Sequence, residues 1–346
     1  MKGTRSRAAG LAVAVGALLA ACGGSGSSSA SSASSASSAS SASSSQQAQA
    51  GASPSPSGPQ PVLDENFPDP DVLQVGDTWY AYATQKASPN SNAQVATSKD
   101  LKTWQLLDTD PLPQLPAWAT TGRTWAPDVS KVGNGYVMYF AAHSTDPDLQ
   151  CIGVARATSP TGPFTNLGSK PLVCPADEGG AIDPASFVDA DGTRYLVWKN
   201  DGNCCGDDTW LQLQKTSADG LKLTGPPVKL VKQDQPWEGD LVEAPTLVRH
   251  GSQYTLLYSA NSYAGDKYVT GYATANKLTG PYTKNPQPLL TTSKTGIIGP
   301  GGQDVVHGPE GSDYLAVHGW DDGLSKRELY LLPVTWQGAK PVVTAG

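Results

Sequence analysis

Short apolar and aromatic runs recur along the chain from about residue 61 onward, each opened by a proline-containing segment. After each proline, the pattern predicts a short strand, a turn rich in Gly with Asn or Asp, and then an aromatic-rich strand. Gly, Asn and Asp supply the positive φ that a hairpin turn needs. Convincing helical periodicity is absent, so the domain is predicted to be all-β.

The proline-containing segments divide the domain into five similar units. They are residues 69–72, 126–129, 183–186, 244–247 and 299–302, and their prolines lie 57, 57, 61 and 55 residues apart. A second echo, in residues 96–104, 155–164 and 273–282, is interpreted as the turns that close three of the units. Five such units predict a five-bladed β-propeller with one four-stranded sheet per blade. A β-sandwich is the all-β alternative, but it does not explain five similar units.

The N-terminus has the charged-then-apolar order of an export signal. Lys2, Arg5 and Arg7 precede an apolar run over residues 8–20, which is too short to span a bilayer comfortably. The run ends in small residues before Cys22 and resembles the lipobox of bacterial lipoproteins. We therefore expect a lipoprotein signal peptide over residues 1–21, with lipid attached to Cys22. An ordinary secretory signal is the alternative.

Composition divides the rest of the chain in two. Residues 22–60 are mostly Ser, Ala, Gly, Gln and Pro, which predicts a disordered tether because little in it is large enough to bury. Residues 61–346 are rich in Trp, Tyr, Val and Leu and form the predicted propeller domain. The formal charge of −7 argues against nucleic acid as a partner. We expect a monomer held at the cell surface.

Four cysteines remain in the exported domain: Cys151, Cys174, Cys204 and Cys205. An even number outside the cytoplasm suggests disulfides. We favour a Cys151–Cys174 pair because both residues flank one predicted hairpin region. The adjacent Cys204 and Cys205 either form a vicinal bond or remain thiols. A zinc site is the competing interpretation, but it lacks a Cys-x-x-Cys motif or a His pair at ligand spacing.

Three carboxylates coincide with the proline segments. The innermost strand of each blade lines the channel of a propeller, so Asp69, Asp183 and Glu243 are predicted to converge there. Like charges in a partly dry pocket raise one another's pKa, which is costly unless acid–base chemistry uses it. Hydrolysis of a glycoside needs one carboxylate to activate water and one carboxyl group to protonate the leaving oxygen. The sequence offers no convincing Ser–His pair, phosphate-binding glycine loop or metal cluster instead.

At these residues the chain resembles glycoside hydrolase family 43. The likeness rests on the order and spacing of residues 67–72, 125–129, 182–192 and 242–245, and it covers residues 62–346. It implies an inverting mechanism with Asp69 as general base, Asp183 as the residue that raises the pKa of the acid and orients it, and Glu243 as general acid. Inversion would place the carboxyl groups of Asp69 and Glu243 about 6.5–9.5 Å apart.

The resemblance also implies substrate-binding residues. Trp125 would form an aromatic wall of the sugar pocket, and Arg327 would reach a substrate hydroxyl. Many members have a Gly-x-Gly-His motif in the last unit. This chain instead has Gly299-Pro300-Gly301-Gly302-Gln303 there, without the histidine. His318 could take that role. From its place in the repeat, Asp128 is interpreted mainly as a structural turn or strand residue, although we expect it to lie close enough to the channel to touch sugar. No cofactor is expected to be required, although a structural calcium near the channel is one option.

Substrate choice stays open at this stage. The favoured substrate is a plant polysaccharide that contains arabinose, cleaved by an α-L-arabinofuranosidase or an arabinan endo-1,5-α-L-arabinosidase. A β-xylosidase is the alternative, but many of those carry an additional C-terminal β-sandwich and this chain ends soon after its fifth unit. A carbohydrate-binding lipoprotein without catalysis is the alternative from another class. A relative that acts on fructosides, or on mannosides by phosphorolysis, is disfavoured because residues 67–71 differ from the fructosidase motif.

Overall fold

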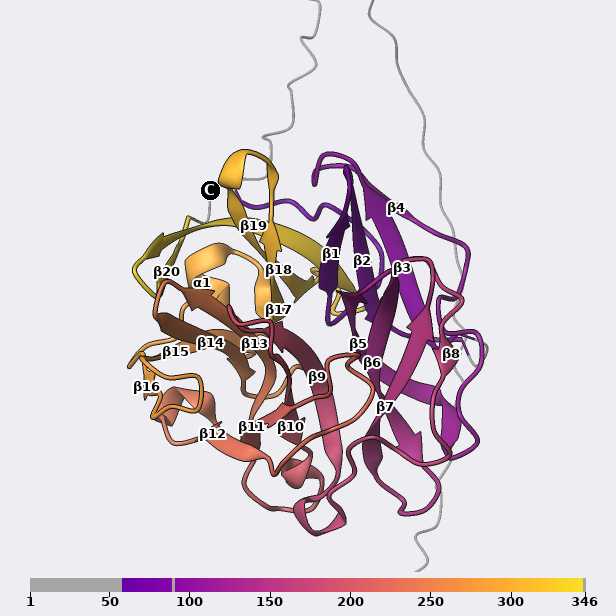
Figure 1. Ribbon diagram of the computed structural model, residues 1–346. Helices are drawn as coiled ribbons and strands as arrows, with labels where there is room; N and C mark the ends of the chain where they lie inside the picture. The colour runs from indigo at the N-terminus through magenta and orange to yellow at the C-terminus, as the bar shows by residue number, and fades with distance from the viewer. Residues whose placement is uncertain (1–57, 89–90, 345–346) are drawn as a thin grey trace, which may run out of the picture. The chain divides into compact units, whose positions relative to one another are not determined.

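The computed structural model describes residues 58–88 and 91–344. They contain five four-stranded antiparallel sheets, each built from strands consecutive in sequence. The first strands of the sheets surround a common centre (Figure 1). The predicted five-bladed β-propeller is confirmed. The signal peptide, Cys22 and nearly all of the tether lie outside the described residues.

The strands follow the order of the blades. Blade 1 contains β1 (Asp71–Val75), β2 (Thr78–Thr84), β3 (Ala93–Ser98) and β4 (Trp104–Leu106). Blade 2 contains β5 (Ala119–Val132), β6 (Gly135–Ser144), β7 (Gln150–Ala157) and β8 (Thr165–Asn166). Blade 3 contains β9 (Ala181–Val188), β10 (Arg194–Asn200), β11 (Trp210–Lys215) and β12 (Val228–Lys232). Blade 4 contains β13 (Val242–His250), β14 (Gln253–Ala260), β15 (Val269–Ala275) and β16 (Thr283–Lys284). Blade 5 contains β17 (Ile298–His307), β18 (Asp313–Trp320), β19 (Arg327–Gln337) and β20 (Lys340–Val343).

Helices are few and short in the described residues. They are α1 (Thr292–Thr295) and the 3₁₀ turns η1 (Ala176–Glu178), η2 (Gly202–Cys204), η3 (Pro236–Glu238) and η4 (Pro309–Gly311). None of the helices in residues 58–88 and 91–344 combines the length and apolarity that a membrane crossing needs.

Apolar side chains between adjacent sheets hold the blades together. Alternate residues of a strand point to opposite faces of its sheet, so the middle strands, which are mostly buried in blades 1, 2 and 4, can pack against both neighbours. One cluster joins Tyr82 of blade 1 to Phe140 of blade 2. Another joins Val197 of blade 3 to Leu256 of blade 4. Burial on both faces leaves the inner strands as the places where polar groups can gather.

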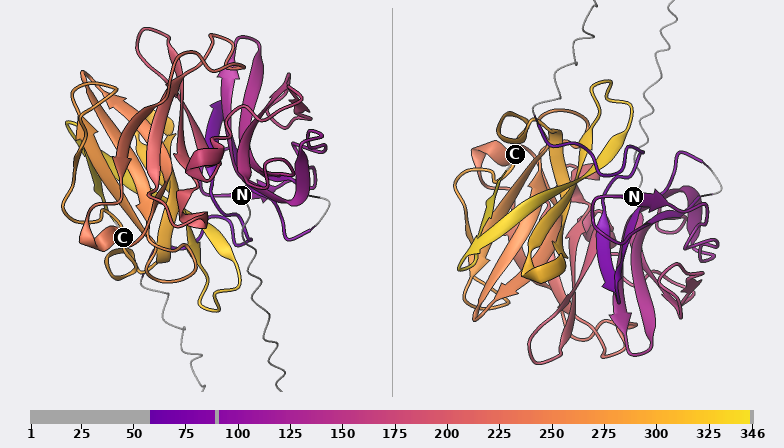
Figure 2. Two further views of the ribbon diagram at one scale, coloured as in Figure 1. Left: turned by 90° about the horizontal axis from the view of Figure 1, so that it is seen from below. Right: turned by 90° about the horizontal axis from the view of Figure 1, so that it is seen from above.

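The start of the described chain closes the ring. The main-chain N–H of Val62 donates to the carbonyl oxygen of Leu329 at 2.8 Å, and that of Phe67 donates to the carbonyl oxygen of Arg327 at 2.7 Å. The segment before β1 therefore runs along β19 of blade 5, as the view from above shows where the first residues lie beside the last blade (Figure 2). This contact places Asp69 next to the polar residues of blade 5.

Every inner strand bends at one equivalent position. Five residues have a left-handed φ there, at 55°, 43°, 52°, 48° and 59°: Asp69, Ala126, Asp183, Ala244 and Gly302. In blades 2 to 5 the strand pairing skips at this point, which is the signature of a bulge. The fifth unit corrects the sequence alignment, because its equivalent is Gly302–Gln303 and not Gly299–Pro300. Pro300 does not mark the bend, because Gly299–Pro300 belongs to a separate shift in strand pairing three residues earlier.

Hydrogen bonds to the preceding blade stabilise these bends. The N–H of Asp69 donates to Nδ1 of His318 at 3.1 Å, and that of Ala126 donates to the hydroxyl of Thr84 at 2.8 Å. The N–H of Ala244 donates to Oδ2 of Asp183 at 2.9 Å. A left-handed residue other than glycine costs on the order of 1 kcal/mol or more, and these inter-blade bonds offset that cost. The bends thus position Asp69, Asp183 and the residue before Ala244, which is Glu243.

Candidate active site

A pocket of about 390 Å³ lies at one end of the ring of bends. Asp69, Asp183 and Glu243 all line it, so the structure brings together the three carboxylates that the sequence singled out. Trp125 and Arg327 line the same pocket, as expected for them. The lining also includes residues that the sequence analysis did not single out as site residues: Thr84, Ile182, Lys199, Asp201, Asn203, Cys204, Leu241, Ser262, Tyr263 and Tyr268.

Asp69 is held as a carboxylate. Its Oδ2 accepts a hydrogen bond from the hydroxyl of Thr84 at 2.7 Å, and its Oδ1 lies 3.5 Å from Nη1 of Arg327. Burial acts to raise the pKa of Asp69, but the positive charge of Arg327 and the surrounding hydrogen bonds outweigh it and hold the pKa well below its usual value. An ionised carboxylate in a pocket is suited to accept a proton from water.

Arg327 is itself fixed by two aromatic rings. Its guanidinium carbon lies 4.9 Å from the ring centroid of Tyr263 and 5.7 Å from that of Trp320. Cation–π contacts of this kind restrict a long side chain that would otherwise be mobile. Arg327 therefore acts on Asp69 from a defined position at the edge of the pocket.

His318 is fully buried behind Asp69 and is absent from the pocket lining. Burial lowers the pKa of His318, so its imidazole is neutral. Nδ1 then accepts the hydrogen bond from the N–H of Asp69, while the ring stacks on Tyr268 with centroids 5.5 Å apart. The expectation that His318 touches substrate is not supported by this position, because the bend at Asp69 places the imidazole under the backbone. His318 thus contacts Asp69 through the main-chain N–H of that residue.

Asp183 and Glu243 lie on adjacent blades and share one polar environment. Burial, with the charge of Glu243 second, raises the pKa of Asp183 to about 8. Two carboxyl groups at one site do not both ionise readily, so Asp183 retains its proton near neutral pH.

Lys199 is the cation of this environment, and the sequence pattern does not indicate it. Its fully buried ammonium lies 3.1 Å from Oε2 of Glu243 and 3.4 Å from Oδ1 of Asp201. Burial acts to lower the pKa of Lys199, but the negative charges of Glu243, Asp183 and Asp201 outweigh it and raise the pKa. In the sequence, Lys199 is a lysine near the end of the apolar strand β10, and a lysine there is ordinarily expected to be exposed to solvent.

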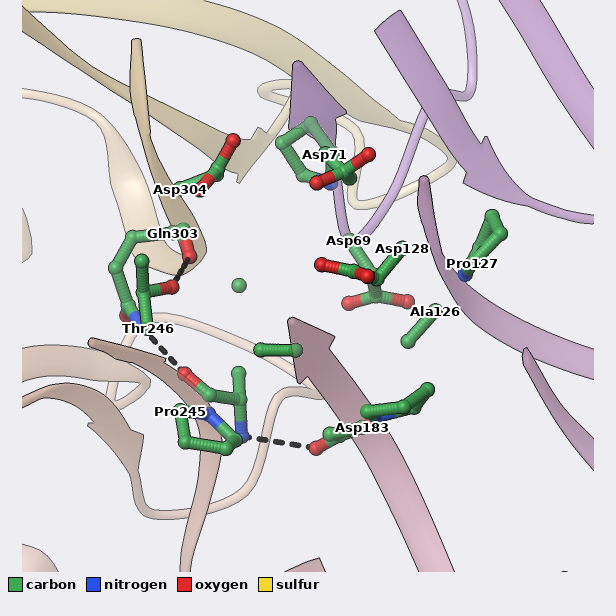
Figure 3. Close-up of a pocket in the computed structure, with 15 residues that line it drawn as sticks. Asp69, Asp71, Ala126, Pro127, Asp128, Asp183, Pro245, Thr246, Gln303 and Asp304 are labelled. Atoms are coloured by element: carbon green, nitrogen blue, oxygen red, sulfur yellow. Dashed lines mark hydrogen bonds between the residues drawn. The ribbon is translucent and has the colours of Figure 1, made fainter. Parts of the chain in front are cut away.

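A smaller hollow of about 50 Å³ continues along the axis of the ring on the other side of the bends. Asp71, Asp128 and Asp304 face it, two residues after the bends at Asp69, Ala126 and Gly302 (Figure 3). Each accepts an N–H of the following blade, from Val129, Ser186 and Val72 respectively, at 2.8–2.9 Å. We call this space the central hollow.

Asp128 is one of the residues that line the central hollow. Asp128 faces the central hollow and does not line the larger pocket. This position corrects the prediction that Asp128 lies close enough to touch sugar, and it agrees with the interpretation of Asp128 as a structural residue. Its place two residues beyond the bend turns the side chain to the opposite end. Burial raises the pKa of Asp128 to about 6 and that of Asp304 to about 7. These groups tie blades together and do not belong to the larger pocket.

The structure also joins the four cysteines in two pairs. Cys151 bonds to Cys174, the pairing that the sequence favoured, and Cys204 bonds to its neighbour Cys205. The calcium option remains a prediction. Within residues 58–88 and 91–344, no group of three or more His, Cys, Asp or Glu residues is placed to hold a metal ion.

Comparison with known proteins identifies the family. A sequence model of Glycosyl hydrolases family 43 matches residues 59–340. The chain belongs to this family. It is therefore a glycosidase, and glycosidases of family 43 hydrolyse O-glycosyl bonds with inversion.

Individual relatives agree with this assignment. The chain is 26% identical over 312 residues to the Extracellular endo-alpha-(1->5)-L-arabinanase 1 of Bacillus subtilis, covering 84% of this chain and 91% of that protein. It is 28% identical over 289 residues to the Extracellular exo-alpha-(1->5)-L-arabinofuranosidase of Streptomyces avermitilis, covering 78% of this chain and 57% of that protein. A crystal structure of a thermostable family-43 glycoside hydrolase matches with 30% identity and a TM-score of 0.75, covering 84% of this chain and 96% of that one.

Proposed function

We propose that this glycosidase removes L-arabinose, or short arabinan pieces, from plant polysaccharide, with Asp69 as general base and Glu243 as general acid. The observation that carries the proposal is the convergence of Asp69, Asp183 and Glu243 on one pocket of about 390 Å³. A pocket of this size fits a sugar unit with part of its neighbour. The names of the relatives from Bacillus subtilis and Streptomyces avermitilis support arabinose as the sugar.

The two ends of the pocket have different electrostatics, which supports the division of roles. Asp69 faces Arg327 and stays ionised, so it takes the proton of the attacking water. Asp183 retains its proton beside Glu243, and in the proposed mechanism Glu243 delivers the proton to the leaving oxygen. Asp183 accepts the N–H of Ala244, the residue after Glu243, so it holds the strand segment that carries the acid.

Inversion follows from this separation of base and acid. Water attacks the anomeric carbon from the Asp69 side, while the leaving group departs toward Glu243. Trp125 covers one face of the sugar with its ring. No covalent sugar–enzyme bond forms in such a mechanism.

A substrate panel tests the proposal. The mature protein is incubated with 4-nitrophenyl α-L-arabinofuranoside, 4-nitrophenyl β-D-xylopyranoside and debranched arabinan, and the first-formed anomer is followed by NMR. We expect the arabinose substrates to be cleaved with release of the inverted anomer, and the product sizes from arabinan to separate exo from endo action. Cleavage of the xyloside alone would contradict arabinose specificity. Binding of arabinan without turnover would contradict the assigned roles.

We also propose that the protein is exported and held at the membrane by lipid on Cys22. The signal-like N-terminus and the extracellular relatives support export. Partition of the full-length protein into a detergent phase, compared with C22A, tests the anchor. We expect only the unsubstituted protein to partition, and equal partition of both would exclude the lipid.

A further inference from the structure

The turn between β10 and β11 brings a disulfide into the substrate pocket. Cys204 lines the pocket of about 390 Å³ together with the carboxylates, and Cys204 and Cys205 are both exposed. They are bonded to each other. The other disulfide differs, because Cys151 is fully buried in the core of blade 2. Sγ of Cys204 lies 3.6 Å from the carbonyl oxygen of Gly179. The Cys204–Cys205 pair therefore reaches the pocket through Cys204, whereas the Cys151–Cys174 pair does not line it.

The backbone of this turn is held firmly. The N–H of Cys204 donates to the carbonyl oxygen of Asp201 at 3.1 Å, and that of Cys205 donates to the carbonyl oxygen of Gly202 at 3.0 Å. The side-chain amide of Asn200 donates to the carbonyl oxygen of Asp208 at 3.0 Å. Gly202 has no space for a side chain, since a Cβ there would lie 2.5 Å from that same oxygen. The turn thus fixes the disulfide at one place on the wall.

The turn lies on the side of the general acid. It begins at Asp201, whose carboxylate contacts the ammonium of Lys199, and that ammonium contacts Glu243. Asp69 is instead surrounded by Thr84 of blade 1 and Arg327 of blade 5, whereas the turn belongs to blade 3. If Glu243 protonates the leaving oxygen, the sugar that departs lies on the side where Cys204 is exposed.

We propose that the Cys204–Cys205 disulfide is a binding surface for the leaving-group sugar and sets the preference for oligosaccharides over glycosides with a small aglycone. The inference rests on the proposed function, because that function fixes the side from which the leaving group departs. Sulfur is polarizable and apolar, so the disulfide packs against the C–H face of a pentose. Its rigid position means that little conformational entropy is lost on binding.

Two comparisons test the proposal. The double variant C204S/C205S is compared with the unsubstituted enzyme on arabinotriose and on 4-nitrophenyl α-L-arabinofuranoside. We expect KM for arabinotriose to rise about fivefold, as for the loss of one contact, while kcat/KM for the nitrophenyl glycoside stays within about twofold. Circular dichroism and the melting temperature report whether the variant is folded.

The second comparison uses the folded enzyme and avoids any folding defect. Dithiothreitol supplies the two electrons and two protons that open the bond to two thiols, and its removal with reoxidation restores the bond. We expect reduction to raise KM for arabinotriose reversibly in the unsubstituted enzyme and to leave C204S/C205S unchanged. The variant C151S/C174S serves as the control, because it lacks the other disulfide and should keep the response.

The outcomes separate this inference from the proposed function. Unchanged KM for arabinotriose, both in C204S/C205S and after reduction, would overturn the inference while the enzyme remains an arabinosidase. An equal loss on both substrates would also overturn it, because the disulfide would then contact the sugar that is cleaved off and not the leaving group. Failure of the unsubstituted enzyme to cleave either substrate would instead refute the proposed function.

Discussion

Replacing Lys199 by Met removes the positive charge nearest Glu243 and leaves its partners buried. At the 3.1 Å separation from Glu243, the Coulomb attraction is about 5 kcal/mol for an effective dielectric constant near 20. Breaking a buried pair by removal of one partner costs about 3–5 kcal/mol. K199M should therefore be destabilised by several kcal/mol at pH 8.

The destabilisation of K199M should depend on pH with a defined sign. Burial already raises the pKa of Asp201 and the charge of Lys199 acts to lower it, so the pKa of Asp201 rises further above its unfolded value without the ammonium. A raised carboxyl pKa gives stability that is present below the unfolded pKa and is lost as the pH rises through the folded pKa. The loss relative to the unsubstituted protein should thus be small near pH 4 and grow toward pH 8. Urea unfolding at several pH values measures it.

The activity of K199M gives a second readout that structural damage alone would not produce. Asp183 loses its proton near pH 8 in the unsubstituted protein, which predicts an alkaline limb of kcat/KM there. In K199M this limb should move to higher pH, because the charge of Lys199 that lowers the pKa of Asp183 is removed. The shift should be one pH unit or more, since about 1.4 kcal/mol of lost interaction corresponds to about one unit.

Two further variants serve as controls for K199M. Lys229 pairs with Glu178 at 2.9 Å but is 44% exposed, so K229M should change stability by less than about 1 kcal/mol. The double variant K199M/D201N should recover part of the stability, because it removes one of the carboxylates left unpaired. A K199M enzyme whose alkaline limb stays in place or moves to lower pH would refute the assigned electrostatics.

Two further predictions concern the bends and the central hollow. G302A should lose about 1–3 kcal/mol more stability than G76A in thermal unfolding, because its Cβ would lie 2.5 Å from Nδ1 of His318 whereas Gly76 has open space around it at a similar φ; equal losses would show that the bend tolerates a side chain. D304N should be more stable than the unsubstituted protein at pH 8 by on the order of 1 kcal/mol or more and equal to it near pH 4, because burial raises the pKa of Asp304 to about 7 and its stabilisation is lost as the pH rises through that value. Equal stability at pH 8 would contradict a raised pKa.

The fold could be predicted because its signal is repeated. Five similar units of strand, Gly-containing turn and aromatic strand leave few architectures that bury both faces of every sheet. The position of Gly302 could not be predicted in the same way. The conformation that defines the bend is a left-handed φ, and proline only accompanies it in four blades, so alignment by proline placed the fifth mark at Gly299–Pro300.

Some residues of the candidate site could be predicted from the repeat, and others could not. Asp69 and Asp183 stand at the bends and Glu243 stands just before one, so the repeat alone indicates them. Lys199 comes from a second strand, and its role depends on burial that no local pattern reveals. Asp128 shares the repeat register with Asp71 and Asp304, and only the backbone bend determines which end of the ring its side chain faces. Position in a repeat therefore predicts convergence but not side-chain direction.

The most direct test of the central claim is the dependence of E243Q on the leaving group. An enzyme without its general acid should still cleave arabinofuranosides of acidic phenols, such as 2,4-dinitrophenol, because these leave without protonation. Cleavage of arabinotriose should fall by about 10²–10⁴-fold. A loss that is equal on both substrates, or full activity on arabinotriose, would contradict the assignment of Glu243 as the acid.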